Sequence, residues 1–227
     1  MEEMDGVEMM SETYGIDPVA ETYGMESRAE NSPIVLKALK CIDEVYPDGN
    51  TLNEGYFPTD AFINEMVRWV IDIVPSHELT NRVNLSLQNP SIEGDVGYGT
   101  LPNLFDGRIV YFKAKEWKRA ATNVITEDDP RYIQQGNKVL RGNASRPVVA
   151  LVNSSRGYIG RAVEWYSATE TSFLGLYVPY SIDFIPTNLE DLAAWKLAEI
   201  VLMSMSDAQA AAVCTAKVNE HLEMLAL

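Results

Sequence analysis

The sequence predicts an α+β protein in which N- and C-terminal helix pairs form a helical bundle, an antiparallel β domain is inserted between them, and an extended acidic tail comes first. Apolar residues repeat at helical spacing towards both ends of the chain and alternate with polar residues in the middle. Each helix pair has an apolar face and no partner nearby in sequence, so we expect the two pairs to pack together. The expected parts are the tail at 1–30, the bundle at 31–78 and 187–227, and the β domain at 79–186.

The tail is too acidic and too poor in apolar side chains to build a core. It contains nine carboxylates and one arginine, a net charge of −8 in a chain whose total is −15. Such a segment cannot offset its own ordering entropy, which is about 1 to 2 kcal/mol per residue for the backbone alone. We therefore expect the tail to become ordered on a partner.

A short motif occurs twice in this tail. Residues 12–15 and 21–24 both read Glu-Thr-Tyr-Gly, and an apolar residue and then an acid follow each copy. Chance similarity in a biased segment is one reading. The other starts from the preference for tyrosine as an interface anchor and from the reach of nine extended residues, which is at most about 30 Å. On that reading Tyr14 and Tyr23 occupy equivalent pockets on successive copies of a partner protein.

Two helices are expected after the tail. Ser32 is a suitable cap for the first helix, Pro33 suits its first turn, and the turn cluster at 47–50 ends it. Thr59 begins the second helix, which Pro75 ends. Helical spacing predicts that the second helix buries one stripe, made of Phe62, Met66, Trp69, Val70 and Ile73.

The middle of the chain has the spacing of β-strands. Runs rich in β-branched and aromatic residues are separated by Gly, Pro, Asn and Asp. The expected strands lie near 83–87, 108–113, 147–153, 161–168 and 173–184. The glycine-rich stretch at 92–99 has neither the dinucleotide-binding nor the phosphate-loop spacing, and we expect it to be a flexible loop.

Helical spacing returns after the β domain. Asn188 is the predicted N-cap of one helix, and Ser206 with Gln209 forms the predicted capping box of the next. Because Trp69 and Trp195 belong to the two halves of the predicted bundle, we expect both indoles to be buried in one core.

Composition argues against several classes of protein. The chain has no apolar run long enough for a membrane span, and its N-terminus has acids where a signal peptide has bases, so we expect neither insertion nor export. Cys41 and Cys214 lie far apart in predicted helices, which favours buried thiols over a disulfide framework. A pI near 4.5 without runs of Lys or Arg does not suit a nucleic-acid-binding protein.

The sequence contains no catalytic signature. His77 and His221 have neither a cysteine nor a carboxylate at metal-ligand spacing, so we predict no catalytic residue, metal or cofactor. The acid cluster at 127–129 is followed at once by Pro130, which favours a turn with helix-capping acids. A metal-dependent hydrolase that uses these three carboxylates is one open alternative.

The block at 116–149 concentrates the positive charge of the chain among aromatic and polar residues. A long connection with such content is usually functional rather than slack, and a solvated basic face is the alternative. Its motifs are Trp117-Lys118-Arg119, Arg141-Gly142-Asn143 and Arg146-Pro147-Val148.

These motifs, followed by strands at 147–152 and 162–166 and the helices of 186–227, resemble the head-to-tail connector ring proteins of short-tailed bacteriophages. The similarity is to the adaptor or tail-tubular class, most of all to those of crAss-like phages. It extends over about 31–227 and leaves the acidic tail outside.

The resemblance implies a structural virion protein, assembled in the host cytoplasm, that forms a ring, usually twelve-fold, below the portal protein and next to other connector or tail rings. The helical domain would face the portal and the β domain the tail. Genome DNA would pass through the channel without sequence-specific binding, and the negative net charge agrees with this, because a lumen that attracted phosphates would slow DNA transit. The family has no active site to transfer.

A closed ring needs an interface between unlike surfaces of neighbouring subunits, and guanidinium groups suit carboxylates on a neighbour. We therefore expect the arginines of the block to contact another subunit, or backbone carbonyls within the block, rather than DNA. Charge reversal at Arg141 is then expected to block assembly without unfolding the monomer. The predicted interface residues of the block are Trp117, Arg119, Arg131, Arg141 and Arg146. A protein-binding adaptor outside the virion is the second open alternative.

Overall fold

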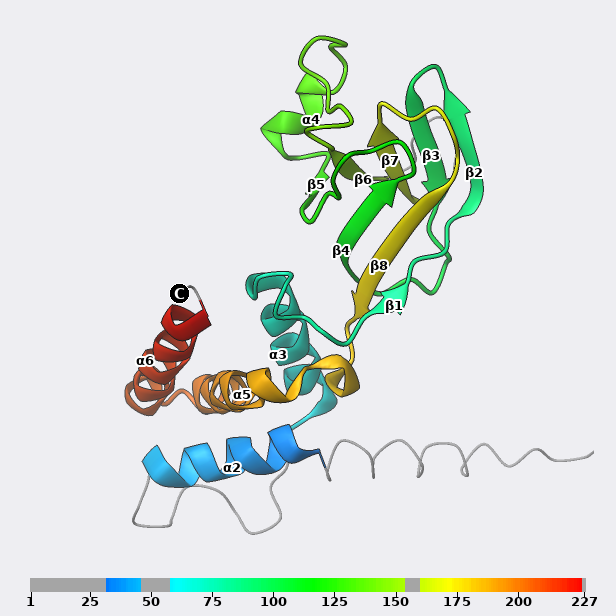
Figure 1. Ribbon diagram of the computed structural model, residues 1–227. Helices are drawn as coiled ribbons and strands as arrows, with labels where there is room; N and C mark the ends of the chain where they lie inside the picture. Colours follow the sequence, from blue (N-terminus) through cyan, green and yellow to red (C-terminus); the bar gives the residue numbers. More distant parts are fainter. Residues whose placement is uncertain (1–31, 46–57, 154–159, 226–227) are drawn as a thin grey trace, which may run out of the picture.

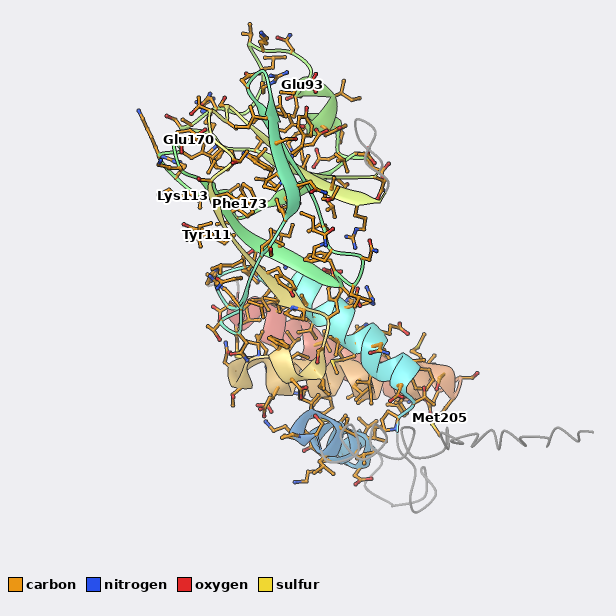
Figure 2. The ribbon with its side chains drawn as sticks, turned by 90° about the vertical axis from the view of Figure 1, so that its right-hand side faces the viewer. Glu93, Tyr111, Lys113, Glu170, Phe173 and Met205 are labelled. Carbon is orange, nitrogen blue, oxygen red and sulfur yellow. The ribbon has the colours of Figure 1, made fainter. Side chains whose placement is uncertain are left out.

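The computed structural model describes residues 32–45, 58–153 and 160–225, so the tail with Tyr14 and Tyr23 lies outside the described residues. Within this part the chain forms five α-helices and two β-sheets, which confirms the predicted α+β class. The helices are α2 (Pro33–Val45), α3 (Asp60–Ile73), α4 (Pro130–Gln134), α5 (Glu190–Ser204) and α6 (Ala208–Leu225). The long helices gather at one end of the molecule and the sheets at the other, both in Figure 1 and in the view turned by 90° in Figure 2.

The strands are β1 (Val83–Asn84), β2 (Gln88–Glu93), β3 (Val96–Thr100), β4 (Gly107–Ala114), β5 (Val124–Thr126), β6 (Val149–Asn153), β7 (Arg161–Tyr166) and β8 (Phe173–Pro179). The first sheet has the order β1-β8-β4, and the second has the order β2-β3-β7-β6-β5. Neighbouring strands are antiparallel except β5 and β6, which pair in parallel. Two short 3-10 turns, at Ile182–Phe184 and Thr187–Leu189, lead from β8 into α5.

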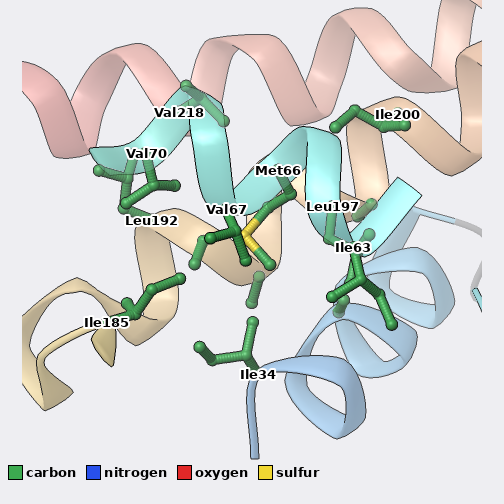
Figure 3. Packing of buried hydrophobic residues seen from close by; sticks show 14 of the residues in the cluster. Ile34, Ile63, Met66, Val67, Val70, Ile185, Leu192, Leu197, Ile200 and Val218 are labelled. Atoms are coloured by element: carbon green, nitrogen blue, oxygen red, sulfur yellow. The ribbon is translucent and has the colours of Figure 1, made fainter. Parts of the chain in front are cut away.

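Helix α5 is the centre of the helical core. Its buried residues lie on nearly every side of the helix, and it contacts α2, α3 and α6. Figure 3 shows Ile34 of α2, Met66 of α3, Leu197 of α5 and Val218 of α6 around one core. A helix that is apolar all round is stable in water only when neighbours cover it. The four helices therefore depend on one another for burial.

The buried stripe of α3 differs from the predicted one. It consists of Ile63, Met66, Val67, Val70 and Ile71, so the helix is rotated about its axis relative to the predicted stripe. Ile73 is 51% exposed. Trp69 and Trp195 both pack against the same helical core, as predicted, but each indole is only partly buried.

Both predicted caps near the C-terminus are wrong. Asn188 lies in a 3-10 turn, and its side-chain amide donates to Glu78 Oε2 at 2.9 Å. Ser206 has a left-handed backbone, with φ of 62°, so the chain turns there and the cap falls one residue later. The carboxylate of Asp207 accepts a hydrogen bond from the Ala210 backbone N–H at 3.0 Å and so satisfies a free amide of α6.

The two cysteines are buried free thiols, as predicted. Cys41 lies in α2 and Cys214 in α6. Burial, which disfavours the thiolate, raises the pKa of Cys41 to about 12 and that of Cys214 to about 11. Both groups therefore remain protonated and act as small apolar side chains in the core.

The two sheets pack face to face around a second core. Phe112 of β4 and Trp165 of β7 meet there with ring centroids 5.4 Å apart. The glycine-rich stretch that we expected to be a loop is the β2–β3 hairpin. Its glycines have a packing role, because a Cβ atom on Gly97 would lie 2.0 Å from Cε2 of Trp165.

The helical core and the first sheet are fixed to each other at the C-terminal end of α3. Arg108 of β4 donates to the carbonyl oxygens of Ile71 at 2.6 Å and Val74 at 2.8 Å. Helices end with unpaired carbonyls, and a cation is the favoured partner for them. Arg68 on α3 also pairs with Asp106 at 2.7 Å, just before β4. The position of the first sheet relative to the helices is thus set by contacts between α3 and β4.

None of the helices in the described ranges combines the length and the apolar character that a membrane crossing requires.

Candidate protein interaction site

The basic block is built mainly on the outer face of the second sheet. We call residues 127–148, between β5 and β6, the β5–β6 segment. It includes α4, and in Figure 1 it stands away from the helices at the far end of the molecule. Tyr132 and Val148 of the segment pack against buried side chains of the sheet. Because Trp165 faces the first sheet and Tyr166 faces the segment, β7 is buried on both sides.

Acids at the start of the segment have internal roles. Asp129 caps α4 by accepting from the Arg131 N–H at 2.8 Å, and the Arg131 guanidinium holds the pKa of Asp129 down to about 2. Glu127 accepts from the Asn153 backbone N–H at 3.0 Å. The prediction of a turn with a helix-capping acid is confirmed for Asp129.

Two of the three carboxylates of the hydrolase alternative have partners within the fold. Asp129 is engaged by Arg131, and Glu127 is engaged by the backbone of β6. Across the described ranges, no group of three His, Cys, Asp or Glu side chains could hold a metal ion.

Gln135 holds the rest of the segment in place. Its side-chain amide donates to the Arg131 carbonyl oxygen at 2.8 Å and accepts from the Gly142 N–H at 2.8 Å. Its own carbonyl oxygen accepts from Nε of Arg141 at 2.7 Å. Gln135 is 4% exposed, and its bonds close the loop between α4 and β6. The sequence showed it only as a polar residue among others, so its structural role was not predicted.

Arg141 is one of the predicted interface residues that the structure places inside the fold. Besides the Gln135 carbonyl it binds the carboxylate of Asp95, in the turn between β2 and β3. Its guanidinium also lies 5.8 Å from the ring centroid of Tyr166. Contact with a carbonyl within the block was one of the two roles predicted for these arginines, and Arg141 has that role.

Trp117 is the second predicted interface residue that lies inside the fold, and its assignment to an interface needs correction. The indole is 2% exposed, and its Nε1–H donates to the Tyr166 carbonyl oxygen at 3.0 Å. It packs 5.9 Å from the ring of Phe112 in the core between the sheets. Trp117 therefore has almost no exposed indole surface for a partner. It fills the core between the sheets, and its one donor is already used there.

The remaining three arginines line one cleft. Arg119, Arg131 and Arg146 are exposed and surround an open cavity of about 540 Å³ between residues 119–125 and the β5–β6 segment. Arg131 is paired with Asp129. The guanidinium groups of Arg119 and Arg146 have no hydrogen-bonded or ionic partner among the residues that the structure describes.

Exposed apolar side chains accompany these cations. Ile133, Val139 and Leu140 are 82%, 89% and 59% exposed, and Val139 and Leu140 also line the cleft. Arginine beside exposed apolar side chains is typical of protein interfaces. The pair Val139-Leu140 between Lys138 and Arg141 is a sequence signal that could have identified this apolar rim.

The chemistry of the cleft suits the binding of a partner group. Its described lining residues include no His, Cys, Asp or Glu, which are the usual groups for proton transfer. What they supply is cationic and amide donors, with Pro147 and Val148 as an apolar wall. Such a cleft can take a carboxylate and an aromatic or aliphatic group together.

The contacts of Arg141 change the expected effect of reversing its charge. Arg141→Glu should lower the free energy of unfolding by about 2 kcal/mol, since a charged hydrogen bond is lost and two carboxylates meet at Asp95. Urea denaturation of the full chain measures it. Arg119→Glu is the matched control, because the exposed Arg119 should change stability by less than about 0.5 kcal/mol. Equal stability of the two variants would mean that Arg141 has no structural role.

No protein-family model matches this chain, and a search of curated proteins also returns no match.

Proposed function

We propose that this chain is a structural virion protein, a ring subunit of a bacteriophage head-to-tail connector located below the portal. The surface that carries the proposal is the β5–β6 segment with its cleft. Internal hydrogen bonds hold the segment in place, while Arg119 and Arg146 are exposed and have no partner in the described chain. A prebuilt surface with unused cations suits repeated contact with another protein.

The proposal includes the arrangement of the domains. The helices of 31–78 and 187–227 form one bundle, and the β domain of 79–186 is inserted between them. Its support is the single core that Met66 and Leu197 share across the length of the chain. The bundle faces the portal and the β domain faces the tail, as in the ring proteins that the sequence resembles.

The proposed partners are other copies of this chain in a ring, the portal protein, and further connector or tail rings. The ring is twelve-fold, as is usual in the ring proteins that the sequence resembles. DNA passes through the channel without sequence-specific contacts. A net charge of −15 supports this, because an acidic wall does not retain phosphates. A protein-binding adaptor outside the virion is the second candidate, favoured by the same cleft, which does not require a ring.

Two measurements test the function. Mass spectrometry of purified phage particles should detect the chain. The native mass of the connector complex should show that it contains enough copies of the 25.3 kDa subunit to close a ring. A chain that is absent from particles and forms a defined complex with one host or phage protein would overturn the connector function in favour of the adaptor. A chain that is present in particles in only one or two copies would overturn the ring.

A further inference from the structure

The cleft and the acidic tail have complementary chemistry. The cleft offers Arg119 and Arg146 without partners in the described chain, beside an apolar wall that includes Val139 and Leu140. The tail has a net charge of −8 and twice places a tyrosine beside glutamate in Glu-Thr-Tyr-Gly. Carboxylates suit guanidinium groups, and a tyrosine ring suits an apolar wall with polar groups at its rim.

We propose that this cleft binds the Glu-Thr-Tyr-Gly motifs of acidic tails from other copies of the chain. The inference rests on the proposed ring, since it names one partner of the tail within that assembly. Glu12 and Glu21 pair with Arg119 and Arg146, and the rings of Tyr14 and Tyr23 lie against the apolar wall. A volume of about 540 Å³ is in the range of sites that take one side chain with its neighbours.

The number of motifs indicates that a tail binds the clefts of other copies and not only the cleft of its own chain. One tail has two motifs, whereas this cleft has room for one of them. Nine residues separate the two tyrosines, so their sites lie at most about 30 Å apart. One tail can thus engage the clefts of two successive subunits. The tail also has ample reach, since thirty residues extend up to about 100 Å.

A protein partner fits the cleft better than DNA does. Phosphate binding uses cations without an apolar wall, and here Val139, Leu140 and Val148 form a substantial part of the lining. The β5–β6 segment also carries exposed Ile133 beside the cleft, which a phosphate backbone would not cover. Peptide binding uses both features.

Photo-crosslinking in the full chain tests the inference. A photoreactive phenylalanine analogue replaces Tyr14 or Tyr23, and the protein is mixed with an isotope-labelled copy before illumination. Mass spectrometry of the digested products should find crosslinks between unlike copies, from either position to residues 119–123 or 139–148. Crosslinks only within one copy, or only to other surfaces, would overturn the inference.

Matched charge variants complete the test. The double variant Arg119→Glu and Arg146→Glu should reduce the crosslink yield at least tenfold, whereas Lys118→Glu with Lys138→Glu, an equal charge change outside the cleft lining, should leave it unchanged. An equal loss of crosslink yield in both variants would show that the contact depends on overall charge and not on this cleft, which would overturn the inference. Competition by added duplex DNA would assign the cleft to nucleic acid instead.

This result is separable from the proposed function. A ring seen by native mass with no crosslink to the cleft would reject the tail contact alone. Crosslinks between copies in a complex that is not a ring would keep the contact and reject the connector.

Discussion

Leu197→Ala is expected to destabilise the helical core by about 2 to 5 kcal/mol, the usual cost of a cavity left by a buried leucine. Leu197 is fully buried at the centre of α5, the helix that contacts α2, α3 and α6. Its side chain lies in the core that Met66 and Ile34 also line. Because these partners come from both ends of the sequence, the loss should lower one cooperative unfolding transition. Urea denaturation followed by circular dichroism measures it.

Met203→Ala is the matched control in the same helix. Met203 is 58% exposed, and shortening an exposed side chain usually changes stability by less than about 0.5 kcal/mol. An equal effect of the two substitutions would show that α5 is not central to the core. Separate transitions for the helices and the sheets in Leu197→Ala would show that the junction at Arg108 does not couple them.

The helices were predictable because their signals are local. Pro33 and Thr59 mark helix starts to within a residue. The buried face of α3 was less accessible from sequence, since apolar residues surround much of the helix and tertiary packing chose Ile63 and Val67 over Phe62. The same reasoning applies to α5, whose apolar residues lie all round and so indicate burial without indicating a direction.

The β2–β3 hairpin was not predicted because the strand propensities of its residues do not indicate it. Glycine is unfavourable in strands, and Gly97 and Gly99 made the stretch read as a loop. Both are required by contacts from elsewhere: Trp165 lies over Gly97, and Leu87 lies over Gly99. No local pattern shows that a large side chain some 70 positions away in the sequence will need this space, so the reason exists only in the folded chain.

The candidate site was partly predictable. The arginine-rich composition pointed to the block that lines the cleft, and Asp129 has the helix-capping role predicted for the acid cluster. Composition could not separate the internal Arg141 from the exposed Arg119, because that depends on whether Asp95 and the Gln135 carbonyl are within reach. Trp117 was assigned to the surface for the same reason, since its neighbours in sequence are charged and its neighbours in space are aromatic.

The close contact at Gly97 leads to the second large effect. Gly97→Ala should destabilise the β domain by about 3 kcal/mol or more, the upper part of the range for overpacking, since the new methyl group would lie 2.0 Å from Cε2 of Trp165. The indole cannot move aside easily, because Phe112 and Phe173 hold it with ring centroids 5.4 and 5.6 Å away. Urea denaturation of the full chain measures the loss.

Gly136→Ala is the matched control, since its new methyl group would meet only the Ile133 carbonyl oxygen at an ordinary 3.4 Å. The same substitution in a Trp165→Leu variant isolates the contact between residue 97 and the indole. Replacing Trp165 by Leu removes the atoms that Gly97→Ala would strike, so the alanine should cost much less in the Trp165→Leu protein than in the natural one. If the cost of the alanine were the same in both backgrounds, the glycine would be needed for its backbone and not for the space it leaves to the indole.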